Sequence, residues 1–414
     1  MPSKLQRLIA SLLPGVFMIG YVIGTGSVTS MASAGASYGM SLTWTLALSS
    51  LFTHIMLVAL SRLTILTGET TLFTFRKHFG SPVTVFIIFA LAMTQLTSIM
   101  GVMGIVADVF REYTAQITGG PGVPTIVSSA LFTVFLLGLY WVGRHQFFLK
   151  ALAGLVALMG VAFVFTAFLV APDLSTMVEG LVPSMPVPKD PNENPAGLIA
   201  AMVGTTMASV CLITRSVLVQ EKGWTMDEYS EAVRDSGFAM TLLFFINAAI
   251  MACAAGTLFL EGRPVEQATD MVRTLEPLAG PIAAAGFTLG ILAAGLSSLF
   301  PNYVLGPWMA ADFTGRSRDM AGPFFRALVI GASLCGLIVP LFGGRPVAIM
   351  IASQAVSPLV MPLLVAFVWI LISRKDIAGK HAPSPLLHFG MAVTMVFSLY
   401  MTVLAARGFL ASLG

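Results

Sequence analysis

The stretch Gly24-Thr25-Gly26-Ser27 lies near the middle of an apolar segment that runs from Leu12 to Ala36. Two glycines and two hydroxyl side chains give a helix little reason to continue through this point. A short glycine-containing break in a membrane-spanning helix is a sequence pointer to the central site of a transporter. The break frees backbone amide and carbonyl groups, which lipid tolerates only where they line a cavity. These residues are therefore predicted to bind a substrate.

The composition of the chain is that of a polytopic membrane protein. Of its 414 residues, 57% are hydrophobic and only 10% are charged, and the mean hydropathy is +0.89. Apolar runs of 18 or more residues are long enough to cross a bilayer. Eleven such runs are predicted to form transmembrane helices, at residues 11–36, 41–66, 82–107, 124–142, 150–171, 196–219, 236–259, 279–300, 325–342, 346–373 and 386–410. The predicted fold class is all-α.

The distribution of cations predicts the orientation. Lys and Arg concentrate in short loops on the cytoplasmic side of membrane proteins. Most of these residues share one side if the N-terminus is placed in the cytoplasm. The sequence thus predicts a multi-pass protein of a bacterial-type cytoplasmic membrane, with the N-terminus inside and the C-terminus outside.

A second small, polar patch supports an internal repeat. Residues 204–211 read Gly-Thr-Thr-Met-Ala-Ser-Val-Cys inside the sixth apolar run, five runs after the first break. Inverted-repeat transporters have matching breaks at such positions. Close packing of small residues is the other interpretation. The chain is predicted to be one transport domain, 1–414, with repeats at about 11–171 and 196–373 and an extra helix at about 386–410.

The sequence lacks the motifs that are typical of several functional classes. No P-loop occurs, and the three cysteines, Cys211, Cys253 and Cys335, have no metal-site spacing. No catalytic residues, cofactor or nucleic-acid partner are expected, so the chain is not predicted to be an enzyme. Transport would be driven by a gradient, with H⁺ or Na⁺ as possible coupling ions. The partners expected are a small-molecule or ion substrate and the lipid bilayer, and the expected state is a monomer.

The chain resembles the NRAMP family of metal-ion transporters, which has the leucine-transporter fold. Pro14-Gly15, Gly35-Ala36 and Tyr38-Gly39 match the family's first helix, and Gly290–Gly295 followed by Ser297-Ser298 matches its eighth. Arg326 and Ser353-Gln354 also fit the family pattern. The resemblance covers nearly the whole chain and implies an eleven-helix carrier with an inverted repeat.

The family's metal ligands are absent from the corresponding positions. The family motif Asp-Pro-Gly-Asn falls on Gly24-Thr25-Gly26-Ser27, and Met-Pro-His falls on Ala208-Ser209-Val210. A further family histidine falls on Arg215, and the acidic pair of the third helix falls on Ser98 and Gly101. The resemblance therefore implies the family's scaffold without its canonical metal site.

The acidic residues all lie in loops or at the ends of apolar runs, so no carboxylate is expected at mid-membrane. Burying an unpaired dication costs several kcal/mol. A small anionic or neutral polar substrate is therefore the preferred prediction, such as a bicarbonate-like ion, an organic acid or an amino acid. The alternative is a divalent cation, Mg or Mn, in a carboxylate-free hydrated site. A non-transporting sensor and a channel are more remote alternatives.

Two groups of residues are predicted to carry the function. The substrate-binding group is Gly24, Thr25, Gly26, Ser27, Thr206, Ala208, Ser209 and Gln354. The coupling or gating group is His54, Arg215 and Arg326. His54 is either a proton relay or a neutral histidine hydrogen-bonded between helices. Arg215 either attracts an anion or holds a gate through Glu221 or Asp312, or it extends to the interface.

Overall fold

The computed structural model describes residues 24–142, 145–170, 172–188, 193–267, 270–273, 276–315 and 322–411. Helices account for the regular structure in these ranges, and no strand occurs there, so the all-α prediction is confirmed. Residues 11–23, which form the first part of the first predicted span, lie outside the described residues.

The helices follow the predicted apolar runs closely. The first half of the chain forms α3 (Thr25–Tyr38), α4 (Thr43–Thr67), α5 (Thr71–Phe79), α6 (Ser81–Thr118), α7 (Thr125–Val142), α8 (His145–Val170) and α9 (Leu174–Glu179). The second half forms α10 (Pro195–Thr206), α11 (Ser209–Lys222), η1 (Met226–Glu228), α12 (Tyr229–Gly256), α13 (Asp270–Arg273), α14 (Glu276–Thr314), α15 (Pro323–Cys335), α16 (Ile338–Phe342), α17 (Pro346–Val356), η2 (Ser357–Leu359), α18 (Met361–Ser373), α19 (Lys375–Ala378) and α20 (Pro385–Ala411).

Eight helical segments in the described residues are long and apolar enough to cross a membrane. They are α4, α6, α7, η1 with α12, the part of α14 from Thr288, α15 with α16, α17 with α18, and α20. The remaining predicted spans correspond to α3, α8 and the pair α10–α11. The total of eleven membrane crossings stays a prediction.

The sixth predicted span is broken where its polar patch lies. Helix α10 ends at Thr206 and α11 begins at Ser209. The last amide of α10, on Met207, donates to the Val203 carbonyl at 2.7 Å, and α11 opens with the Leu212 amide donating to the Ala208 carbonyl at 3.1 Å. The two half-helices are therefore joined by an unwound link at residues 207–208.

The described part of the first span starts at an irregular residue, and the tenth span is interrupted. Gly24 has an extended backbone (φ −108°, ψ −171°), and α3 begins directly after it. The tenth span contains a break that the sequence analysis did not anticipate, where η2 separates α17 from α18. Pro358 and Pro362 lie at this point and cannot donate backbone hydrogen bonds, which accounts for the interruption.

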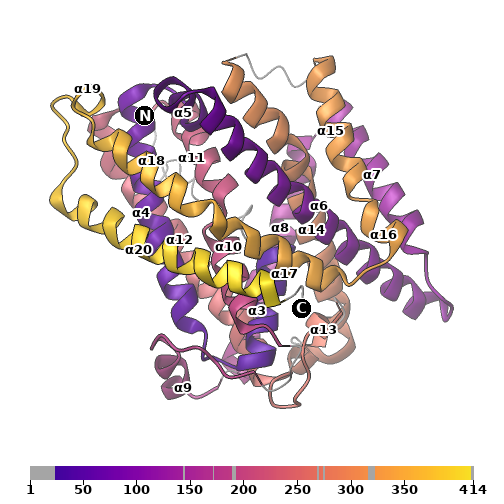
Figure 1. Cartoon of the computed structure of the whole chain (residues 1–414). Coiled ribbons are helices and arrows are strands. Elements are labelled where there is room, and N and C mark those ends of the chain that lie inside the picture. Colours follow the sequence, from indigo (N-terminus) through magenta and orange to yellow (C-terminus); the bar gives the residue numbers. More distant parts are fainter. Residues whose placement is uncertain are drawn as a thin grey trace, which may run out of the picture.

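Helix α3 lies in the lower middle of the molecule in the view of Figure 1. Every residue of α3 except Ser37 is buried, and its closest neighbour is α12. A Cβ atom on Gly35 would lie 2.2 Å from the Met251 carbonyl oxygen of α12, so glycine allows the two backbones to touch. Helices α7, α15 and α16 lie together at one side of the molecule, away from α3 (Figure 1).

Candidate functional site

A cavity of about 60 Å³ lies where the broken helices meet. Since one water molecule needs roughly 10–15 Å³ of such space, the cavity can hold a few waters or a small, partly hydrated ion. Its lining residues come from α3 and its N-cap, α6, α10, α11 and their link, α14, α17 and η2: Gly24, Gly26, Ser27, Thr94, Gln95, Ser98, Val102, Gly204, Thr205, Ala208, Ser209, Ser298, Asn302, Met350, Gln354 and Ser357.

Six of the eight predicted binding residues line this cavity: Gly24, Gly26, Ser27, Ala208, Ser209 and Gln354. The other two lie next to the broken segments but are not among the lining residues. The Thr25 hydroxyl is buried without a hydrogen-bond partner. The Thr206 hydroxyl donates to the Met202 carbonyl of its own helix at 2.9 Å. That these eight residues bind a substrate stays a prediction, although the structure brings most of them together.

The sequence analysis did not select the wall formed by α6 and α14. Helix α6 contributes Thr94, Gln95 and Ser98, and helix α14 contributes Ser298 and Asn302. A signal was present, because these polar residues recur at intervals of three or four within otherwise apolar runs. Ser98 was noted only as a substitute for an acidic residue of the family pattern.

Two hydrogen bonds fix the hydroxyls of the broken helices. The Ser27 hydroxyl donates to Asn247 Oδ1 of α12 at 2.6 Å, and the Ser209 hydroxyl lies 2.9 Å from the Ser357 hydroxyl. By contrast, Gln95 Nε2 and Asn247 Nδ2 are buried without an acceptor. Buried amide donors of this kind are usually satisfied by a protein group, a water or a ligand. Gln95 Nε2 is therefore available to a molecule in the cavity.

The cavity has partial charges but no formal ones. None of the described lining residues is Asp, Glu, Lys, Arg or His, and no group of three or more metal-ligating His, Cys, Asp or Glu side chains occurs among the described residues. Helices α3 and α11 both begin at the cavity without a side-chain N-cap and without an acidic residue in the first turn. Their N-termini carry partial positive charge, whereas the C-terminus of α10 contributes carbonyl oxygens.

Two glycines bring α17 against the broken helices. A Cβ atom on Gly26 would lie 2.4 Å from Met350 Cε and 3.1 Å from Gln354 Nε2. A Cβ atom on Gly204 would lie 1.8 Å from the Gln354 carbonyl oxygen. These close contacts place Gln354 between the two broken spans, and they explain why both positions are glycine.

Arg215 lies outside the cavity, on the distal part of α11, and it is completely buried. Its Nη1 forms an ion pair with Asp235 Oδ2 of α12 at 2.5 Å. Nε donates to the Ser61 hydroxyl of α4 at 2.9 Å, and Nη2 donates to the Ala232 carbonyl at 3.1 Å. Asp235 is a partner that the sequence analysis did not name, and a gate through Glu221 or Asp312 stays a prediction.

Asp235 lies at the end of an apolar run, where acidic residues are expected, but its burial was not anticipated. It lies within α12, which begins at Tyr229 and so extends further than the apolar run that starts at residue 236. Its side chain is as fully buried as that of Arg215. A buried carboxylate next to the apolar run was missed because a helix can continue beyond its apolar part when an internal partner neutralises the charge.

His54 and Arg326 lie away from the cavity lining. His54 Nδ1 lies 3.1 Å from the Ser236 hydroxyl, which joins α4 to α12. The Arg326 guanidinium lies 5.7 Å from the centre of the Trp141 ring, and its Nε is buried without a hydrogen-bond partner. The geometry of His54 matches the interhelical hydrogen bond that was one of its two interpretations.

We expect His54→Gln to retain uptake with an unchanged dependence on pH. Glutamine can keep a hydrogen bond with the Ser236 hydroxyl but cannot titrate. Initial uptake rates of the purified protein in liposomes, measured from pH 5.5 to 8, would check this. A flattened pH profile in the variant would instead identify His54 as a proton relay.

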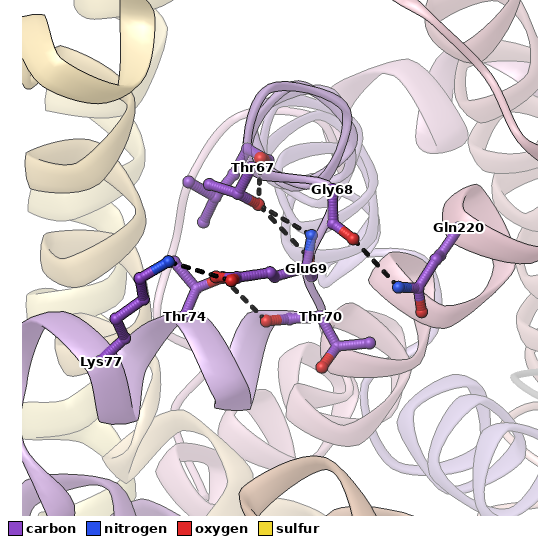
Figure 2. A network of polar contacts seen from close by, with 8 residues as sticks. Thr67, Gly68, Glu69, Thr70, Thr74, Lys77 and Gln220 are labelled. Atoms are coloured by element: carbon purple, nitrogen blue, oxygen red, sulfur yellow. Dashed lines mark hydrogen bonds and ion pairs between the residues drawn. The ribbon is translucent and has the colours of Figure 1, made fainter. Parts of the chain in front are cut away.

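The turn between α4 and α5 attaches the end of α11 (Figure 2). Gly68 ends α4 in the left-handed conformation (φ +67°), and its carbonyl accepts a hydrogen bond from Gln220 Nε2 at 3.0 Å. The Thr67 hydroxyl accepts from the Glu69 amide at 3.2 Å, and the Glu69 carboxylate pairs with Lys77 at 3.0 Å. The turn is therefore ordered by its own side chains and also contacts the half-helix that starts at the cavity.

Comparison with known proteins gives the family. The sequence matches the model of Nramp, described as natural resistance-associated macrophage protein-like, over residues 15–406. The chain belongs to the Nramp family. It is 30% identical over 375 residues to a protein of Klebsiella pneumoniae (strain 342) named divalent metal cation transporter MntH, with 88% of this chain and 85% of that protein covered. An MntH of Deinococcus radiodurans is 27% identical over 388 residues, with 91% and 85% covered.

Solved structures give the same fold for this Nramp protein. A manganese transporter of Eremococcus coleocola has a TM-score of 0.75 at 15% identity, and the match covers 98% of this chain and 87% of that one. MhsT in complex with L-phenylalanine has a TM-score of 0.58 at 17% identity, with 96% and 98% covered. The chain is thus a multi-pass membrane transporter with the leucine-transporter fold.

Proposed function

We propose that the protein is a secondary active transporter that works by alternating access around the cavity between α3, α10–α11 and α17. The observation that carries this proposal is that the unwound link at residues 207–208 and the uncapped start of α3 meet at one cavity. Broken helices at a shared central site are the arrangement on which inverted-repeat carriers rely. Residues 11–171 and 196–373 form the two repeats in this proposal.

The substrate class that the relatives favour is a divalent metal cation. The MntH proteins from Klebsiella pneumoniae and Deinococcus radiodurans carry that function in their names. In this chain the groups lining the cavity that can ligate a metal ion include hydroxyl oxygens, the Gln354 amide oxygen and the Met350 thioether. Hard dications accept oxygen ligands together with retained water. A Mg or Mn ion would therefore bind with part of its hydration shell and without a carboxylate.

A second candidate is a small anionic or neutral polar solute, the substrate preferred from the sequence alone. It is favoured by the α3 N-terminus, which has no side-chain cap, by the α11 N-terminus, where in the described part of the chain only the Ser209 amide is bonded to a side chain, the Ser357 hydroxyl at 3.4 Å, and by the unpaired Gln95 Nε2 at an uncharged cavity. Exposed helix N-termini stabilise negative charge. The names of the relatives do not support this candidate, so it ranks second.

Uptake into liposomes distinguishes the two candidates. The purified protein would be assayed with Mn²⁺, Mg²⁺, bicarbonate and a panel of amino and organic acids, with protein-free liposomes as the control. Saturable Mn²⁺ or Mg²⁺ uptake that Ser27→Ala weakens supports the first candidate. Saturable uptake of an acid or of bicarbonate, without metal uptake, supports the second. No saturable uptake of any of these solutes under an H⁺ or Na⁺ gradient would contradict the proposal.

We expect Gln354→Ala to raise the KM for uptake about 2- to 10-fold, because a hydrogen bond contributes about 0.5–1.5 kcal/mol. Thr97→Ala is the matched control, since the Thr97 hydroxyl bonds to carbonyls of its own helix and does not line the cavity. Initial rates over a range of substrate concentrations would give both KM values. An unchanged KM in Gln354→Ala would remove this residue from the binding site.

The setting of the transporter follows from the same proposal. We place the protein in a bacterial cytoplasmic membrane as a monomer, with the N-terminus inside and the C-terminus outside. The coupling ion is H⁺ or Na⁺, and the liposome assay under each gradient identifies it.

A further inference from the structure

The half-helix α11 has one end at the cavity and the other at the surface of the bundle. Its first residue, Ser209, lines the cavity. Its last residue, Lys222, lies at the other end of the helix and is exposed. The unwound link at residues 207–208 separates it from α10. A half-helix attached through unwound backbone can pivot without breaking its own hydrogen bonds. Its position is then set by the contacts that its side chains make.

Beyond the Ser209–Ser357 contact at the cavity, three described side chains of α11 bond to the surrounding helices and to the turn after α4. Arg215 binds Asp235 and Ala232 of α12 and Ser61 of α4. The Ser216 hydroxyl accepts a hydrogen bond from the Thr71 amide at 3.1 Å. Gln220 donates to the Gly68 carbonyl, as Figure 2 shows. These three attachments run from the middle of α11 to its distal end, and their partners lie on α4, α12, the turn after α4 and the start of α5.

The Arg215 attachment differs from the others in its burial and charge. Both Arg215 and Asp235 are 0% exposed, and the Trp224 ring lies 5.5 Å from the guanidinium. Val219, Trp224 and Ala232 form a small buried cluster beside the pair. Moving α11 away would leave two charges unpaired unless water reached both of them, so the pair and the cluster have to open together.

We propose that the Arg215–Asp235 pair is a latch that holds α11 closed against α4 and α12 at this end of the transporter. The latch rests on the proposed alternating-access function, and it makes Arg215 a positioning residue that does not contact the substrate. Releasing the pair hydrates both charges and frees α11 to open the cavity toward its distal end. In this proposal the first residue of α11, Ser209, contributes to substrate binding at the uncharged cavity. Arg215, further along the same half-helix, contributes to gating through its ion pair.

Cysteine accessibility tests the latch. Val219→Cys reports on the α11 end, because Val219 is 1% exposed in the buried cluster. Ala352→Cys reports on the opposite end, because Ala352 is exposed in a second cavity that also contains Asn194 and Gly197 near the start of α10. Each reporter would be placed in a full-length chain whose three native cysteines are alanine. Rates of modification by a polar thiol reagent would be measured in lipid nanodiscs.

With Asp235→Asn, we expect the rate of thiol modification at Val219→Cys to rise about tenfold and the rate at Ala352→Cys to fall. The reason is that the state open at the α11 end becomes more populated and the state open at the opposite end becomes less populated. Adding Arg215→Gln to Asp235→Asn should move both rates back toward those of the parent, since a neutral amide pair can restore a hydrogen bond. Asp376→Asn is the matched control, because the Arg374–Asp376 pair at 2.8 Å is exposed.

Two results would overturn the latch. Unchanged rates in a folded Asp235→Asn variant would show that the pair does not hold α11. Rates that rise at both reporters would show local unfolding and a purely structural role. The labelling experiment and the uptake experiment test different claims. If the modification rates at the two reporters change in opposite directions but no saturable uptake is found, the latch is supported and the tested substrates are rejected. Saturable uptake with unchanged labelling rejects the latch alone.

Discussion

Arg215→Met is expected to lower the free energy of unfolding by about 3–5 kcal/mol, because it leaves the buried Asp235 carboxylate without its counter-charge. Both side chains of the pair are fully buried, and the guanidinium also donates hydrogen bonds to the Ser61 hydroxyl and the Ala232 carbonyl. Thermal unfolding of the purified protein in detergent, followed by the intrinsic fluorescence of its tryptophans, would measure the loss.

The double variant Arg215→Met with Asp235→Leu is the informative control. Replacing both members of a buried pair by apolar residues of similar size is often neutral or stabilising. We therefore expect the double variant to be more stable than Arg215→Met alone. If Arg215→Met were as stable as the parent protein, the ion pair would have no part in that stability.

Gly204→Ala is expected to destabilise the protein by at least about 1–3 kcal/mol, the usual cost of overpacking a core. The added Cβ would lie 1.8 Å from the Gln354 carbonyl oxygen, which belongs to the backbone of α17 and cannot rotate away. The same displacement would move Gln354 within the cavity, so uptake should fall as well. Thermal unfolding and initial uptake rates would be measured on one preparation.

Gly138→Ala is the matched control for Gly204→Ala. Gly138 lies in the interior of α7, and a Cβ atom there would have no other heavy atom within 4 Å. Alanine in place of glycine within a helix stabilises it by roughly 0.5–1 kcal/mol. If Gly204→Ala were at least as stable as the parent protein, α17 would be able to shift and accommodate the methyl group.

The sequence analysis located the candidate site from the hydroxyl residues and glycines that interrupt apolar runs. Six of the predicted residues share the cavity because such interruptions coincide with unwound backbone, and unwound backbone at mid-membrane requires a cavity. The wall that holds Gln95 and Asn302 was not selected, because isolated polar residues in long helices more often bond to neighbouring helices. Their proximity to Ser27 depends on how α6 and α14 cross α3.

The break at η2 and the pairing of Arg215 show the limits of sequence patterns. Pro358 indicates a possible interruption, but prolines are tolerated in membrane helices when neighbouring groups compensate. The pairing of Arg215 with Asp235 depends on the rotation of α11 against α12, which hydrophobic periodicity alone does not specify.

By itself, the sequence determined that this is a helical, multi-pass membrane protein of the Nramp family with an interruption near Ala208, because hydropathy and small polar breaks are local properties of the chain. The tertiary structure decided which side chains share the cavity, that Ser27 bonds to Asn247, and that Arg215 is neutralised by Asp235. These contacts join residues far apart in sequence, and their geometry follows from how closely glycines such as Gly204 let the helices approach.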